Sequence, residues 1–269
     1  MFLCLIILLL CTNCKTNKVV SDEVEHFASA ALFQLMPPQV VTDSILFREN
    51  TEVVLAMDFP GSEIRYTLDG SVVTERSTLY NDAITIGETA LLQAMVFHPD
   101  CKTSEVIRKQ FYKTNAILND ATLALSPNAD SRYAANGVSS LTDLQKGSAQ
   151  FRGENRWLGF KKDTISIVVE FTKKTKMKSL VVSTLANELG WIFIPHRFEL
   201  LTEGKVFAEV KRENIENVFD TGLHYVEMSF AERALNCFTL RIIGEPLPEG
   251  HNGYGGVAWF FVDEIFIPE

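Results

Sequence analysis

The chain is poor in cysteine and carries none of the short motifs that mark the common catalytic schemes. Three of its five cysteines lie within the first 14 residues, which leaves Cys101 and Cys237 in the rest of the 269-residue sequence. Two isolated cysteines cannot form a disulfide framework, and we expect both to be buried free thiols. The histidines show no spacing such as His-Glu-x-x-His, and no Gly-x-Ser-x-Gly elbow, phosphate-binding loop or Cys-x-x-Cys pair follows residue 14. These absences predict that the protein is not an enzyme.

Basic residues are fewer than acidic ones: the sequence has 25 Lys and Arg and 34 Asp and Glu, which gives a net charge of −9. An acidic chain has no general attraction for nucleic-acid phosphates, so we expect no nucleic-acid partner. Long amphipathic helices are nearly absent, which argues against a Rossmann or barrel enzyme fold. What remains is ordinary globular composition, 46% hydrophobic and 22% charged, in a chain long enough for two domains.

The N-terminus opens with MFLCLIILLLC, an apolar run followed at once by polar residues. The run is too short to span a bilayer and is typical of a secretory signal peptide. A cysteine directly after such a run resembles the lipobox of bacterial lipoproteins, whose thiol is diacylated. The resemblance implies a signal peptide over residues 1–14, with Cys14 as the lipidated residue and Cys11 as the alternative; a plain signal peptide or an uncleaved anchor stays open. It places the protein in the cell envelope, at the outer membrane or cell surface, with the lipid anchor as its only membrane contact, or else as a secreted or periplasmic protein.

Residues 15–38 are predicted to form a short helix or an ordered linker. Apolar residues recur at near-helical spacing between Val24 and Leu35. Pro37 and Pro38 then end any helix, because proline cannot continue one and biases the preceding residue toward an extended conformation.

Residues 39–113 contain five short segments rich in branched and aromatic residues: TEVVLAMDF, EIRYTL, DAITI, TALLQAMVF and EVIRKQFY. Gly, Asp, Asn or Pro separates them, and this pattern predicts β-strands. Alternation is clearest in IRYTL, where Ile64, Tyr66 and Leu68 point to one face and the residues between them to the other. Five or six strands over this length favour a small β-sandwich.

Residues 115–269 form a second β-rich region with longer loops. Its predicted strands lie in TISIVVEF, KSLVVSTL, GWIFIPHRFELL, LHYVEMSF, NCFTLRII and GVAWFFVDEIFIP. An eight-stranded jelly-roll sandwich is the fold that this pattern favours. The predicted fold class is therefore all-β, with two sandwiches in series.

The first β-region carries the run YTLDGS at 66–71, then STLY at 77–80, an Ala-Ile pair at 83–84 and Ala94. With these motifs, residues 39–113 resemble the small immunoglobulin-like domain at the C-terminal side of bacterial chitobiases and β-hexosaminidases. Asp69 and Gly70 both tolerate positive φ, so we assign Asp69 to a type I′ or related turn rather than to catalysis.

The second β-region carries Leu-Thr-Asp at 141–143, Gly-Ser at 147–148, WLGF at 157–160 and HNGYGG at 251–256. With these motifs it resembles the discoidin-type, galactose-binding-like module that follows the immunoglobulin-like domain in many family 20 glycoside hydrolases. Leu144 stands where the family pattern has glycine, so a left-handed corner there would be strained. The chain has no room for the catalytic barrel of those hydrolases and resembles only their non-catalytic tail.

Asp263 and Glu264 are the one adjacent carboxylate pair in an apolar setting. Family 20 hydrolases use an Asp-Glu pair, but neighbours on a strand point to opposite faces, so these two are not expected to flank one glycosidic bond. The galactose-binding-like resemblance implies instead a structural calcium ion held by hard oxygen ligands, at Asp143, Ser148 and Glu264. In the alternative, Asp143 caps a turn and Glu264 pairs with a Lys or Arg.

For sugar binding, the resemblance implies the loops at one end of the sandwich, where an aromatic ring stacks on a sugar and His, Arg or Asn bind its hydroxyls. The matching ligand-binding residues are Trp191, His196, His251, Asn252 and Tyr254, with Arg152 and Trp157 nearby in the pattern. Tyr254 lies in a Gly-rich loop and is the best exposed candidate. The tryptophans at 157, 191 and 259 lie in apolar runs, and core packing is the alternative for them.

Together these features predict a non-catalytic, exported, lipid-anchored carbohydrate-binding or accessory protein of a bacterial glycan-degrading system. Its ligand would be a glycan that contains N-acetylhexosamine or galactose. Two alternatives remain open: a structural or protein-interaction module that braces a cell-envelope partner, and the detached C-terminal part of a split β-hexosaminidase.

Overall fold

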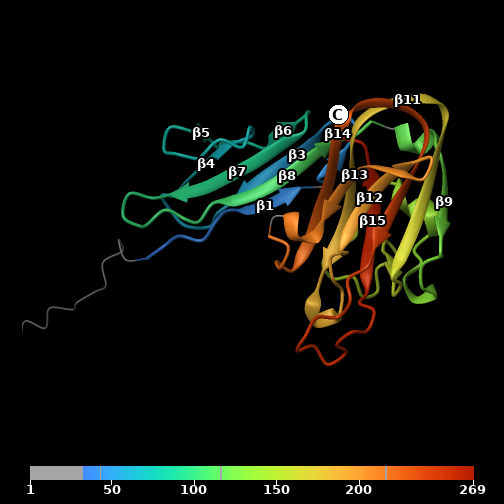
Figure 1. Ribbon diagram of the computed structural model, residues 1–269. Coiled ribbons are helices and arrows are strands. Elements are labelled where there is room, and N and C mark those ends of the chain that lie inside the picture. The colour runs from blue at the N-terminus through green and yellow to red at the C-terminus, as the bar shows by residue number, and fades with distance from the viewer. Residues whose placement is uncertain (1–32, 43, 116, 216) are drawn as a thin grey trace, which may run out of the picture.

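The computed structural model describes residues 33–42, 44–115, 117–215 and 217–269. The predicted signal peptide, Cys11, Cys14 and most of the predicted helix lie outside these residues. Within them the regular structure consists of β-strands and short 3-10 helices, arranged as two β-sandwiches in series (Figure 1). The all-β fold class is confirmed. No helix in the described ranges is long and apolar enough to cross a membrane.

The first sandwich packs a three-stranded sheet against a five-stranded one. The smaller sheet has the order β1 (Gln39–Thr42), β3 (Thr51–Ala56) and β6 (Ile84–Ile86). The larger has the order β2 (Leu46–Phe47), β8 (Ile107–Lys113), β7 (Ala90–Phe97), β4 (Glu63–Thr67) and β5 (Thr78–Leu79). Every second residue of β3 is buried, because alternate side chains of a strand face the core. The core between the sheets includes Val53, Leu92 and Phe111.

Asp69 lies in the turn that follows β4. Gly70 adopts φ of +77°, but Asp69 is not among the residues with positive φ, so the turn is not of type I′. The Asp69 carboxylate instead accepts a hydrogen bond from the backbone N–H of Ser71 at 3.0 Å, and bonding to Ser71 holds the pKa of Asp69 below its usual value. Asp69 therefore has a local role in forming the turn.

The second sandwich is built from one seven-stranded sheet that bends until its two halves face each other. β11 (Thr164–Ala186) and β14 (Gly222–Ile243) pair with each other and run through both halves. One half adds β9 (Thr122–Ser126), β12 (Arg197–Thr202) and β13 (Lys205–Lys211), and the other adds β15 (Phe260–Phe266) and β10 (Leu158–Phe160). Side chains of both halves form one buried cluster, which includes Ile167, Val182, Leu240 and Val262.

The sequence predicted four separate strands where the structure has two long ones. TISIVVEF and KSLVVSTL join into β11, and LHYVEMSF and NCFTLRII join into β14. Pairing between β11 and β14 shifts register between Glu170 and Thr175 and again between Met177 and Ser179. Such irregularities bend a strand without ending it, and the exposed, lysine-rich sequence at 172–176 suits the outside of a bend. The strand expected in GWIFIPHRFELL begins only at Arg197.

The two cysteines of the folded part are free, as predicted, but only one is even partly buried. Cys101 is half-buried and Cys237 is exposed. Phe238 faces the core, so strand alternation turns Cys237 outward. The prediction that both thiols are buried is therefore wrong for Cys237.

The two sandwiches meet at a small apolar junction close to the C-terminus (Figure 1). The Thr114 hydroxyl of the first sandwich donates to the Ile267 carbonyl at 3.0 Å, and the Glu269 N–H donates to the Lys113 carbonyl at 3.0 Å. The buried cluster at the junction combines two residues of the first sandwich with two of the second: Leu46, Tyr112, Val181 and Phe266. β15 thus ends at the junction, and the loops before it lie at the other end of the second sandwich.

Candidate functional site

Asp263 and Glu264, on β15, are both fully buried. The sequence predicted that they point to opposite faces, but the pairing of β15 is irregular beside them. Ser183 of β11 pairs with Glu264, whereas Thr184 pairs with Val262, so Asp263 is left outside the ladder. This bulge brings both carboxylates within the electrostatic reach of one ammonium group, that of Lys146.

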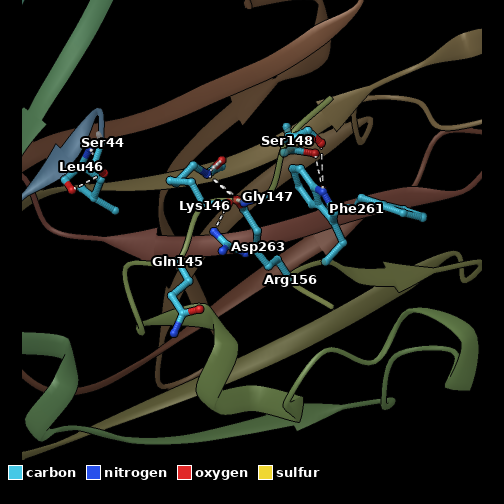
Figure 2. Close-up of polar contacts among 12 residues, drawn as sticks. Ser44, Leu46, Gln145, Lys146, Gly147, Ser148, Arg156, Phe261 and Asp263 are labelled. Atoms are coloured by element: carbon cyan, nitrogen blue, oxygen red, sulfur yellow. Dashed lines mark hydrogen bonds and ion pairs between the residues drawn. The ribbon is translucent and has the colours of Figure 1, made fainter. Parts of the chain in front are cut away.

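Lys146 and Asp263 form an ion pair in the interior, where they point toward one another (Figure 2). Lys146 Nζ lies 2.7 Å from Oδ1 and 2.6 Å from Oδ2 of Asp263, and it also donates to the hydroxyl of Ser183. The backbone N–H of Gly147 donates to Oδ2 at 2.7 Å. A lysine has three protons to donate, and this one finds three acceptor atoms while both oxygens of its partner are satisfied.

The loop that carries Lys146 is fixed by the residues that follow it. A Cβ atom on Gly147 would lie 2.3 Å from the Trp157 ring, so only glycine fits there. The indole Nε1 of Trp157 donates to the Ser148 carbonyl at 3.2 Å. Ser148 donates to Glu154 with its hydroxyl at 2.6 Å and with its backbone N–H at 2.8 Å. These bonds fix the conformation of the loop, so that the Lys146 side chain points toward β15.

Burial dominates the electrostatics of this centre. The pKa of Glu264 is raised to about 9, chiefly by burial and next by the charge of Asp263. Lys146 lowers this pKa in part, and the neighbouring carboxyl of Asp143 raises it. Glu264 is therefore protonated at neutral pH, and its O–H can donate to the neighbouring carboxyl of Asp143. Burial lowers the pKa of Lys146, and pairing with Asp263 works against that effect.

The three expected calcium ligands have different surroundings. Asp143 is exposed, and its carboxyl lies beside that of the buried Glu264. The Ser148 hydroxyl donates to Glu154 and accepts from the Gln150 N–H at 3.1 Å, so both of its hydrogen-bonding roles are taken. No group of three or more His, Cys, Asp or Glu side chains in the described ranges is placed to hold a metal ion. Two carboxyl groups beside a fixed ammonium do not fit a divalent ion well.

At the other end of the sandwich, loops bring together four of the five predicted sugar-binding residues. Trp191 follows the short 3-10 helix η5 (Glu188–Gly190) in a left-handed conformation with φ of 64°, and it is 40% exposed. Its ring meets the His251 ring edge to face, with 4.6 Å between centroids. Tyr254, 69% exposed, and the exposed Asn252 lie in the same loop as His251.

Close packing positions this loop against Trp191. A Cβ atom on Gly253 would lie 2.7 Å from Leu247 and 3.2 Å from the Trp191 ring, so the loop approaches the tryptophan only because that position is glycine. The Gly253 N–H donates to Nδ1 of His251 at 3.1 Å, which orients the imidazole. The rings of Trp191 and His251 are therefore held in contact, and the exposed Tyr254 lies in the same loop as His251.

His196 belongs to a polar cluster beside the same loops. Its Nδ1 lies 3.3 Å from Glu245, whose carboxylate also lies 3.8 Å from Arg212. Arg212 in turn lies 3.5 Å from Glu188, the first residue of the turn that leads to Trp191. The sequence did not predict a role for Arg212, Glu188 or Glu245. Glu188 and Glu245 lie close in sequence to Trp191 and His251, which was an available signal, whereas Arg212 joins them only through the fold.

Trp157 and Arg152 belong to a neighbouring loop, whose Phe151 packs against Gly190 and Ile192 beside Trp191. Trp157 is 1% exposed and packs in a buried cluster with Phe151 and Phe261, so the core alternative holds for it. The Arg152 guanidinium lies over Phe151, 5.3 Å from the ring centroid. Of the three tryptophans, only Trp191 is exposed; Trp259 is half-buried.

Residues 44–108 match the family model of the chitobiase/beta-hexosaminidase C-terminal domain. The match covers most of the first sandwich and confirms its resemblance to that domain. It leaves the second sandwich, with Lys146 and Trp191, outside the matched range. No curated protein matches the sequence.

Solved structures align with this chain at low sequence identity and with low TM-scores. A family 32 carbohydrate-binding module of Clostridium perfringens NanJ, in complex with galactose, is 15% identical with a TM-score of 0.37, over 58% of this chain and 98% of that one. A SusE-like protein is 10% identical with a TM-score of 0.33, over 86% of this chain and 97% of that one. A GH29 fucosidase of Ruminococcus gnavus, in complex with fucose, is 10% identical with a TM-score of 0.36, over 58% of this chain. The match spans only 26% of the fucosidase chain.

Proposed function

We propose that this protein is a non-catalytic carbohydrate-binding protein that holds a glycan on the loops before β15. The observation that carries the proposal is the contact between Trp191 and His251 beside the exposed Tyr254. Large aromatic side chains held at a surface by packed loops favour binding, because the face of a sugar ring can stack on them. Glycans that contain galactose or N-acetylhexosamine are the class to test first.

The polar cluster beside these rings supplies the second element of sugar recognition. Arg212 offers guanidinium donors and Glu245 offers carboxylate acceptors, and both are partly exposed. Sugar hydroxyls need donors and acceptors in fixed positions, and the ion pairs that join Arg212 to Glu188 and Glu245 fix these two groups. Binding would be reversible, with stacking and hydrogen bonds as its only interactions.

A glycan array followed by titration calorimetry tests this proposal. We expect saturable binding by the wild-type protein and loss of at least about 1 kcal/mol of binding free energy in Tyr254→Ala and in Trp191→Ala, as for aromatic residues at the centre of a binding site. Phe59→Ala is the matched control, because it removes a 42% exposed aromatic side chain from the first sandwich. Absence of binding to every glycan would overturn the proposal.

A protein partner is the second candidate, and one observation favours it. Leu189, next to Trp191, is 99% exposed, and Phe219, which lies beside Arg212, is 76% exposed. Exposed apolar residues near one another are typical of protein interfaces. Leu189→Ser separates the candidates, because it should weaken a protein complex while leaving glycan affinity unchanged.

We also propose that the protein is anchored in the cell envelope by a lipid on Cys14. The proposal rests on the apolar run and the cysteine that follows it. Cells fed labelled palmitate should incorporate label into the wild-type protein and into Cys11→Ser, but not into Cys14→Ser. Label in Cys14→Ser and none in Cys11→Ser would move the anchor to Cys11, and no label in the wild-type protein would overturn it.

A further inference from the structure

The Lys146 ammonium is a buried positive charge on the face of β11 that carries Val181 and Ser183 and packs against the junction. The Lys146 side chain is 12% exposed, and its Nζ lies 2.6 and 2.7 Å from the two oxygens of the fully buried Asp263. A third acceptor, the Ser183 hydroxyl, completes the set. Burial of an ammonium is tolerated only where its protons all find acceptors and a counter-charge is present, and both conditions hold here.

The surroundings of this ammonium are those of a hard cation. Oxygen atoms of Asp263 and Ser183 contact it directly, and the carboxyl groups of Glu264 and Asp143 lie beyond. Two aromatic rings close the remaining sides, with Nζ 5.2 Å from the Tyr225 centroid and 6.0 Å from the Trp157 centroid. A cluster of buried oxygens of this kind needs a positive charge at its centre, and Lys146 places one there.

The ligand set expected for a calcium ion is not available around this centre. Ser148 is engaged by Glu154 and Gln150, and an ion between Asp143 and Glu264 would lie beside the Lys146 ammonium and be repelled by it. We propose that the Lys146 ammonium takes the place of a structural divalent cation in this module. The positive charge is covalently part of the chain, so the fold of the second sandwich does not depend on calcium.

Thermal unfolding of the full chain, in calcium chloride and in EDTA, tests this inference. We expect the wild-type Tm to be the same in both. Lys146→Met keeps most of the length of the side chain but leaves the buried Asp263 carboxylate without its counter-charge, and it should lower Tm by about 10 °C. Lys178→Met is the matched control, since Lys178 is an exposed lysine of β11 and its loss should leave Tm unchanged.

The double variant Lys146→Met/Asp263→Asn tests the inference even if the single variant does not fold. It removes both charges at once and should recover most of the Tm lost by Lys146→Met. Calcium should raise the Tm of neither the wild-type protein nor the double variant. A wild-type Tm that rises with calcium, or calcium binding to the wild-type protein in titration calorimetry, would overturn the proposal.

Discussion

The rings of Tyr112 and Tyr225 lie 5.4 Å apart between centroids, one from each sandwich. Tyr225 also faces Lys146, and Tyr112 meets Phe266 at 5.1 Å. The junction between the sandwiches therefore lies directly over the buried ion pair. Burial raises the pKa of both tyrosines, so both hydroxyls stay neutral over the ordinary pH range. Loss of the junction would expose the ion pair to water.

Tyr225→Phe should not destabilise the protein, although it alters a residue at the centre of this junction. The Tyr225 hydroxyl is buried and has no hydrogen-bond partner among the described residues, so its removal loses no bond. Tyr225→Ala should instead cost about 3 kcal/mol, because it leaves a cavity beside Lys146 and Tyr112. Urea unfolding of both variants measures the difference, and a cost above about 1 kcal/mol for Tyr225→Phe would show that the hydroxyl is bonded.

Leu144→Ala should destabilise the protein more than Leu144→Gly does. Leu144 adopts φ of 62°, which strains any residue but glycine, and its side chain packs against the junction cluster. Both variants lose the packing, but only glycine also relieves the backbone, by about 1 kcal/mol. The packing lost in both variants outweighs the strain that glycine relieves. Urea unfolding should therefore give the wild-type protein the highest free energy of unfolding, Leu144→Gly the next and Leu144→Ala the lowest. Alanine more stable than glycine would mean that the strain is absent.

Glu264→Gln should flatten the pH dependence of stability. Because the pKa of Glu264 is about 9 in the folded protein and close to 4.5 when unfolded, the folded state binds more protons between these values. The contribution of Glu264 to the free energy of unfolding is then complete below pH about 4.5 and is lost as pH rises toward about 9. Glutamine is neutral throughout and removes this slope. Burial lowers the pKa of Lys146, so Lys146 contributes in the opposite direction at high pH. Because the charge of Glu264 acts on Lys146, both groups belong to the slope that Glu264→Gln changes. If the free energy of unfolding changed with pH equally in the wild-type protein and in Glu264→Gln, the raised pKa of Glu264 would be contradicted.

Gly147→Ala should be among the most damaging single substitutions in the second sandwich. Its Cβ atom would lie 2.3 to 2.7 Å from the Trp157 ring, which is itself buried and unable to move aside. We expect a loss of about 3 kcal/mol or more, since overpacking also disturbs the Lys146 loop. Gly87→Ala is the control, because its nearest neighbour would lie 4.0 Å away. Equal Tm values for the two variants would show that the loop adapts.

The strands of the first sandwich could be predicted from sequence because they are short, alternate regularly and end at turn residues. Ile64, Tyr66 and Leu68 all contact the core, as the alternation of IRYTL indicated. The long strands β11 and β14 could not be predicted in the same way. The polar stretch around Lys173 looks like a loop in sequence, and it stays in a strand only because β11 and β14 pair on both sides of it.

The two functional centres differed in how far sequence could locate them. Glycine-rich sequence marked the loop with His251 and Tyr254, because glycine has a local conformational meaning. Lys146 and Asp263 lie 117 positions apart, and no local pattern predicts that they meet. The bulge that turns Asp263 toward Lys146 is likewise a property of pairing with β11, which sequence alternation alone cannot reveal.

β11 and β14 each pass through both halves of the second sandwich, and this continuity has a consequence for how the domain opens. Neither half can detach without breaking strands that the other half also uses, so hydrogen exchange along β11 should show similar protection on both sides of the bend. The two faces of the sandwich then behave as one cooperative unit, and a glycan bound at its loop end would slow exchange at residues beside the junction as well.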